Sequence, residues 1–159
     1  MVRGRGLRRL HATVRLPWPA TPGDVRGHFK PGGALPFLAI PANELADSHA
    51  DLSELWGPAA QEFRQRLFQA LEPQERFAIA EHFLRERLRC GHLPHSAISA
   101  AVGMLSNTTS VSAVAAEVGF SHRHFIKLFV QQVGLPPKRV GRLLRFQRAL
   151  NTVRTTDLS

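Results

Sequence analysis

The chain has 159 residues, 43% of them hydrophobic, and carries a formal net charge of +9. This length suits one domain or two small units that share a core, and the hydrophobic content is too high for a disordered chain. The single cysteine, Cys90, excludes an internal disulfide. No apolar run approaches the roughly 20 residues that span a bilayer, and no apolar core follows the Arg-rich N-terminus as a secretory signal requires. We therefore expect a cytoplasmic protein with no membrane partner.

The positive charge is concentrated at the two ends of the sequence. Residues 1–30 sum to +6, residues 31–110 to −3 and residues 111–159 to +6. A basic C-terminal third beside a near-neutral middle indicates a localised binding surface for a polyanion, and nucleic acid is the usual one. A basic protein whose charge serves only solubility is the alternative.

The N-terminal part is predicted to contain little regular structure. Residues 1–25 are rich in Gly, Pro and Arg, and we expect a flexible, disordered basic arm. Residues 26–40 have a strand-like pattern, in which the turn signal Pro31-Gly32-Gly33 precedes a short apolar stretch. The prediction is a short β-hairpin that packs on the rest of the chain, since an isolated hairpin is marginal in water.

Helices are predicted for most of the remaining sequence, so the expected fold class is mainly α, a helical bundle. Asp51 is the expected N-cap of a helix that runs to about Leu71, and a second helix begins at Pro73 and ends near Arg89. A third covers residues 96–105. The residues expected to face inward on the first two helices are Leu52, Leu55, Trp56, Phe63, Leu67, Leu71, Phe77, Ile79, Ala80, Phe83, Leu84 and Leu88.

Residues 111–133 are predicted to form a helix-turn-helix. Ser110 can cap a short first helix, and Ser121 can cap a second one after a three-residue turn. Gly119 lies in that turn, where only glycine takes a left-handed conformation without a steric cost. Ala115 is small at the point where the two helices would cross. The apolar positions that agree with this geometry are Val114, Val118, Phe120, Phe125, Leu128 and Phe129.

One face of the predicted second helix has the residue types that read DNA. Arg123, Ile126, Lys127 and Val130 share this face, opposite to the apolar one. An α-helix fits the major groove, where Arg and Lys donate hydrogen bonds to guanine and an apolar side chain contacts a thymine methyl. The expected base contacts are therefore made by Arg123, Ile126 and Lys127. Ile126 could instead pack on a neighbouring helix, and this alternative stays open.

Residues 95–150 resemble the AraC/XylS family of bacterial transcription regulators. The resemblance rests on VAAEVGFS and HFIKLF within the helix-turn-helix, on VGLPPKR (residues 133–139) and on RLLRFQRA (residues 142–149). In that family the segment that matches VGLPPKR closes a first helix-turn-helix, and the segment that matches RLLRFQRA begins a long helix that leads to a second helix-turn-helix. A weaker resemblance of residues 26–90 is to the end of the sensor region in a subgroup of these regulators.

The resemblance implies a sequence-specific DNA-binding protein in three parts. They are the arm of residues 1–25, a partial sensor-like region at 26–90 and an incomplete DNA-binding domain at 91–155. Residues 151–159 contain no second helix-turn-helix, so a truncated member is expected, and a small-molecule effector is implied by the family. The residues expected to contact the DNA backbone, or to lie where a helix N-terminus holds a phosphate, are Ser121, His122, His124, Lys138, Arg139 and Arg142.

Two further arginines extend the basic pattern, and the sequence contains no motif that favours another function. Arg145 and Arg148 continue the basic face of the last helix and could contact phosphate or face solvent. No enzyme, cofactor or metal is expected. Cys90, His92 and His95 lack the second Cys pair of a usual zinc site, although His122 and His124 lie nearby in the sequence, and no nucleophile or phosphate-loop motif is present.

The alternative to a DNA-binding regulator is an interaction module. In it the helices of residues 51–105 pair with a second copy or with a full-length relative, as a homodimer or a heterodimer. Some of the aromatic residues of this segment would then be exposed. They are Trp56, Phe63, Phe68, Phe77 and Phe83.

Overall fold

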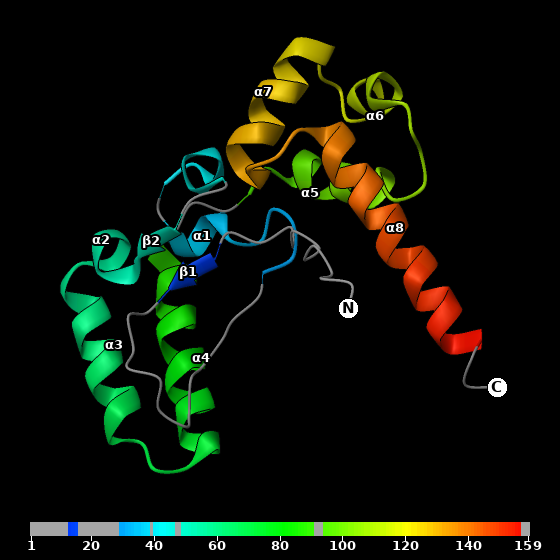
Figure 1. The fold of residues 1–159 in the computed structure, drawn as a ribbon. Coiled ribbons are helices and arrows are strands. Elements are labelled where there is room, and N and C mark those ends of the chain that lie inside the picture. Colours follow the sequence, from blue (N-terminus) through cyan, green and yellow to red (C-terminus); the bar gives the residue numbers. More distant parts are fainter. Residues whose placement is uncertain (1–12, 16–28, 39, 47–48, 91–93, 157–159) are drawn as a thin grey trace, which may run out of the picture.

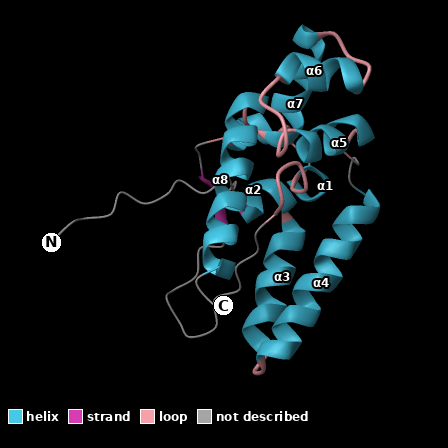
Figure 2. Ribbon diagram, turned by 90° about the vertical axis from the view of Figure 1, so that its right-hand side faces the viewer, coloured by secondary structure: helices cyan, strands magenta, loops and turns pink. Residues whose placement is uncertain are grey.

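A computed structural model describes residues 13–15, 29–38, 40–46, 49–90 and 94–156 (Figures 1 and 2). These residues are mainly helical, which confirms the predicted fold class. The elements are β1 (Thr13–Arg15), α1 (Leu35–Leu38), the 3-10 helix η1 (Ala42–Leu45), β2 (His49–Asp51), α2 (Leu52–Trp56), α3 (Pro58–Gln69), α4 (Pro73–Cys90), α5 (Ser96–Met104), α6 (Val111–Glu117), α7 (His122–Val133) and α8 (Pro137–Thr156). No helix within these ranges has both the length and the hydropathy that crossing a bilayer requires.

The β-hairpin predicted for residues 26–40 is wrong. Leu35–Leu38 is helix α1, and the two described strands, β1 and β2, pair in parallel with Thr13 beside His49. An apolar run this short fits a helix or a strand equally well, because periodicity does not separate them over so few residues. Pro36 favours the helix, since proline is tolerated in a first helical turn but interrupts a strand ladder. The arm expected at residues 1–25 lies outside the described residues, apart from β1.

The single helix predicted from Asp51 to about Leu71 is two helices. Asp51 caps α2 as predicted, since its Oδ1 accepts a hydrogen bond from the Ser53 N–H at 2.8 Å. Gly57 then takes a φ of +56° and separates α2 from α3, whose first residue is Pro58. A proline at that position loses no hydrogen bond, because the first amides of a helix have no intrahelical partner.

A first hydrophobic cluster holds α2, α3 and α4 together. Its buried members are Leu52, Trp56, Ala60, Phe63, Leu67 and Phe83. Three rings pack in series, with centroids 5.6 Å apart between Trp56 and Phe63 and 5.0 Å apart between Phe63 and Phe83. The Trp56 indole N–H donates to the Phe37 carbonyl at 2.7 Å, and the Arg87 guanidinium lies over the Trp56 ring at 4.9 Å. These contacts fix α1 and α4 to α2.

Several large apolar side chains of α3, α4 and the turn between them are exposed, contrary to the prediction. Leu71, Phe77 and Leu88 are 85%, 67% and 44% exposed, although each was expected to face inward. Phe68 is 75% exposed. Two helices packed side by side cover only one face of each other, so apolar residues beyond that face stay in contact with solvent. We call Phe68 of α3, Leu71 of the turn between α3 and α4, and Phe77 of α4 the hairpin tip.

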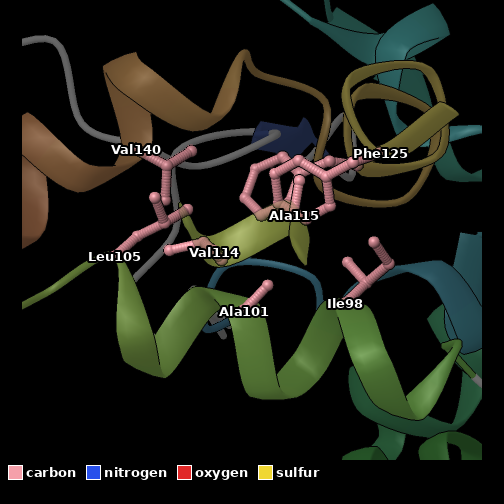
Figure 3. Close-up of a cluster of buried hydrophobic side chains, with 8 residues drawn as sticks. Ile98, Ala101, Leu105, Val114, Ala115, Phe125 and Val140 are labelled. Atoms are coloured by element: carbon pink, nitrogen blue, oxygen red, sulfur yellow. The ribbon is translucent and has the colours of Figure 1, made fainter. Parts of the chain in front are cut away.

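A second hydrophobic cluster joins α5, α6, α7 and α8 (Figure 3). Its buried members are Ile98, Ala101, Leu105, Val114, Ala115, Phe125, Phe129 and Val140. Phe125 and Phe129 are fully buried, with ring centroids 5.4 Å apart. Ala115, 1% exposed, lies next to Phe125 where α6 meets α7. A larger side chain at this position would overpack the crossing.

The segment before β2 joins the two clusters at the C-terminal end of α7. Gly134 ends α7 with a φ of +84°, and a Cβ on it would lie 2.8 Å from the Ala42 carbonyl oxygen of η1. The His95 N–H, from the connection into α5, donates to Gln132 Oε1 at 2.9 Å. The C-terminal end of α7 thus packs against η1 and the connection into α5. Helices α6 and α7 lie at the end of the molecule opposite to the hairpin tip (Figures 1 and 2).

Candidate nucleic-acid interface

The helix-turn-helix has the caps and the turn that its sequence predicts. Ser110 Oγ accepts a hydrogen bond from the Ala113 N–H at 3.2 Å at the start of α6. Ser121 Oγ accepts one from the His124 N–H at 3.4 Å at the start of α7. Gly119 lies between them with a φ of +78°, the left-handed conformation that glycine adopts most easily. Local residues therefore set where each helix begins and how the chain turns between them.

Two of the residues predicted to face DNA are exposed on α7. Arg123 and Lys127 lie four residues apart, on the side of the helix away from Phe125 and Phe129. We call this pair the basic face of α7. Neither cation forms an ion pair that the structure shows within the described residues. The two side chains can therefore donate hydrogen bonds to acceptors outside the protein.

Ile126 was expected either to contact a base or to pack on a neighbouring helix, and its burial is intermediate. It is half-buried and packs partly against the cluster of α5–α8, and Val130 is half-buried as well. Only part of the Ile126 side chain is available to a ligand. The exposed surface of α7 is consequently more polar than the sequence pattern indicated.

The histidines predicted near the start of α7 are both exposed, but their surroundings differ. The His124 ring packs edge-on against Phe120, with centroids 5.0 Å apart, and His95 packs on the same phenyl ring at 5.3 Å. His122 and the capping Ser121 are also exposed. The structure thus brings Ser121, His122 and His124 together at the first turn of α7, where the helix N-terminus favours an anion.

The basic residues of α8 divide into two groups. Lys138, Arg139 and Arg142 are exposed in the first part of the helix, as a phosphate contact requires. Arg145 and Arg148 instead bind the chain itself. Arg145 Nη1 donates to the Thr108 carbonyl oxygen at 2.7 Å, and Arg148 Nη1 donates to the Ser106 carbonyl oxygen at 3.3 Å. Both contacts are with the turn that follows α5, so neither side chain simply faces solvent.

One further polar residue of α7 was missed at the sequence level. Gln131 is exposed and lies four residues after Lys127, so it continues the basic face by one turn. Its amide has the donor and acceptor pattern that pairs with adenine in the major groove. The spacing of residues 123, 127 and 131 was the signal that could have identified it.

No group of three residues able to hold a metal ion occurs in the described ranges. The side chain of Cys90 and all of His92 lie outside those ranges, so the cluster considered in the sequence is not seen. Compared with protein-family models, curated proteins and solved structures, the chain gives no match.

Proposed function

We propose that this protein binds double-stranded DNA through α7, as a cytoplasmic transcription regulator of the AraC/XylS type without enzymatic activity. The observation that carries the proposal is the basic face of α7. It presents Arg123 and Lys127 to solvent on a helix whose opposite side is fully buried in a helix-turn-helix. A helix that is anchored on one side and cationic on the other is suited to insertion into the major groove.

The dimensions of α7 are compatible with this role. Its 12 residues give a length of about 18 Å, and a helix about 10–12 Å across fits a groove about 12 Å wide. Arg123 lies in the first turn, which is the part of a recognition helix that usually contacts base edges. The preferred partner of Arg or Lys is guanine, through its O6 and N7 acceptors.

The first part of α8 supplies the expected phosphate contacts. Lys138 and Arg142 are exposed there, in addition to the cations of α7. Such contacts release counterions from DNA, so affinity falls as salt rises, with a slope set by the number of phosphates contacted. The local charge agrees, since residues 111–159 sum to +6.

The test is fluorescence anisotropy with a duplex selected from a random library, over a range of salt concentrations. We expect Lys138→Ala to weaken binding to every duplex and to lower the salt slope by about 0.9. Arg123→Ala should cost about 1–3 kcal/mol at one favoured base pair and leave the other positions unchanged. Arg85→Ala is the matched control, because Arg85 pairs with Glu81 on α4, a helix of the other hydrophobic cluster. Absence of any salt-dependent binding by the wild type would contradict the proposal.

The interaction module remains a second candidate because the hairpin tip is exposed. Phe77, which this interpretation expects to be partly exposed, is 67% exposed, whereas Trp56 is buried. Exposed apolar residues that gather at one place indicate a contact surface. Sedimentation velocity of the wild type and of Phe77→Ser distinguishes the two functions. Self-association that the substitution abolishes favours the module, and a strictly monomeric species that binds DNA counts against it.

A further inference from the structure

Two arginines of α8 bind the turn that connects α5 to α6, residues 105–110. The Arg145 Nη1 donates to the carbonyl oxygens of Leu105 at 3.0 Å and of Thr108 at 2.7 Å. The Arg148 Nη1 donates to the carbonyl oxygen of Ser106 at 3.3 Å and to the side-chain oxygen of Asn107. Four oxygens of a single turn are therefore bound by two side chains that come from about 40 residues further along the sequence.

The contact with Leu105 satisfies a group that the helix leaves without a partner. The last carbonyls of an α-helix have no intrahelical donor, and Leu105 is the C-cap of α5. Gly141 allows α8 to come close enough for the contact. A Cβ at this position would lie 3.0 Å from the Leu105 carbonyl oxygen and 3.1 Å from Arg145 Nη1. Small size at residue 141 and a long side chain at residue 145 thus act together.

The same turn is hydrogen-bonded to the first helix of the helix-turn-helix. Thr108 Oγ1 accepts from the Ser110 N–H at 3.2 Å, and Ser110 Oγ accepts from the Ala113 N–H at 3.2 Å. One residue later α6 buries Val114 and Ala115 in the cluster that also contains Phe125 of α7. A continuous chain of contacts therefore runs from Arg145 through the turn to α6 and on to α7.

We propose that Arg145 and Arg148 are positioning residues, which fix α8 to the start of the helix-turn-helix and do not contact phosphate. The role rests on the proposed function, and it assigns two different roles to the basic residues of α8. The exposed Lys138 and Arg142 contact DNA, whereas Arg145 and Arg148 hold these cations in a constant position relative to Arg123 and Lys127. The pattern of basic residues in the sequence does not show this division, because every member has the same charge.

Hydrogen exchange of the full chain tests the positioning role without DNA. Arg145→Lys keeps the charge but loses the planar guanidinium, and Arg142→Lys is the matched control on the exposed side of the same helix. We expect the amides of Ser110 and Ala113 to exchange at least tenfold faster in Arg145→Lys and at the wild-type rate in Arg142→Lys. Arg145→Gln, which cannot reach the turn, should show the larger increase. Wild-type exchange in both Arg145 variants would overturn the proposal.

DNA binding supplies the second measurement. Arg145→Ala should weaken binding about tenfold with an unchanged salt slope, because no phosphate contact is lost. Arg142→Ala should instead lower the slope by about 0.9. An equal fall in slope for Arg145→Ala would make Arg145 a phosphate contact and refute the proposal. If the wild type binds no duplex, the proposed function fails, while the exchange measurement still decides the role of Arg145.

Discussion

The two ends of the molecule cover their apolar side chains to very different degrees. In the helix-turn-helix end, Phe125, Phe129 and Val140 are fully buried, because α5, α6, α7 and α8 enclose them from several directions. At the hairpin tip, Leu71 lies in the turn between α3 and α4 and Phe77 lies on α4, and these two helices cover each other on one side only. An apolar pattern therefore shows which residues could be buried, whereas burial itself depends on how many elements surround them.

Removing one aromatic ring at each end should change the stability of the protein to very different degrees. Phe125→Ala should lower the free energy of unfolding by about 3–5 kcal/mol, because the fully buried side chain leaves a cavity. Phe77→Ala should change it by no more than about 0.5 kcal/mol, since most of that ring is in solvent. Urea unfolding followed by circular dichroism measures both. Equal losses in the two variants would show that the hairpin tip is covered in solution.

A smaller effect is expected at the junction between the two ends. Gly134→Ala and Gly119→Ala both place a side chain on a left-handed residue, at a cost of about 1–2 kcal/mol. Only at Gly134 does the new Cβ meet a neighbour, the Ala42 carbonyl oxygen at 2.8 Å. Gly134→Ala should therefore destabilise the protein by about 1–3 kcal/mol more than Gly119→Ala, measured by the same unfolding experiment. Equal costs would mean that η1 does not pack on α7 in solution.

The smallest effect concerns the cap of α2 and its dependence on pH. The Ser53 backbone N–H and hydroxyl donate to Asp51 and hold the pKa of its carboxyl below the ordinary value of 3.8. The ionised form is thus favoured by folding, so its contribution to stability is present above 3.8 and is lost as the pH falls through the lowered pKa.

Asp51→Asn provides the comparison, because asparagine also caps helices but does not ionise here. The difference in unfolding free energy between wild type and variant, followed from neutral pH to about pH 2, should shrink as the carboxylate is protonated. A difference that stays constant with pH would contradict the assignment.

The helix-turn-helix was predictable because its signals are local. Ser110, Gly119 and Ser121 each act on the backbone within three residues, so the sequence alone determines the caps and the turn. The exposure of Arg123 and Lys127 follows from helical spacing once the buried side is known. The half-burial of Ile126 does not, because it depends on neighbouring side chains.

Other features depend on contacts that no local pattern contains. The break at Gly57 was signalled by the Gly-Pro pair, but the apolar periodicity continued across it and concealed the break. The exposure of Phe77 and Leu88 reflects the absence of a covering element among the described residues. The contacts of Arg145 join residues 37 and 40 positions apart, and only the tertiary structure could show them.

The place of Trp56 gives the molecule a selective optical probe. The chain contains no tyrosine and only two tryptophans, and Trp18 lies outside the described residues. In a Trp18→Phe variant, all indole emission would come from Trp56, a buried ring whose N–H is hydrogen-bonded to the Phe37 carbonyl oxygen. Helices α5–α8 contain no tryptophan. Fluorescence then follows the α2–α4 cluster alone, while circular dichroism follows every helix. Coincident unfolding curves mean one cooperative unit, and separated curves mean two.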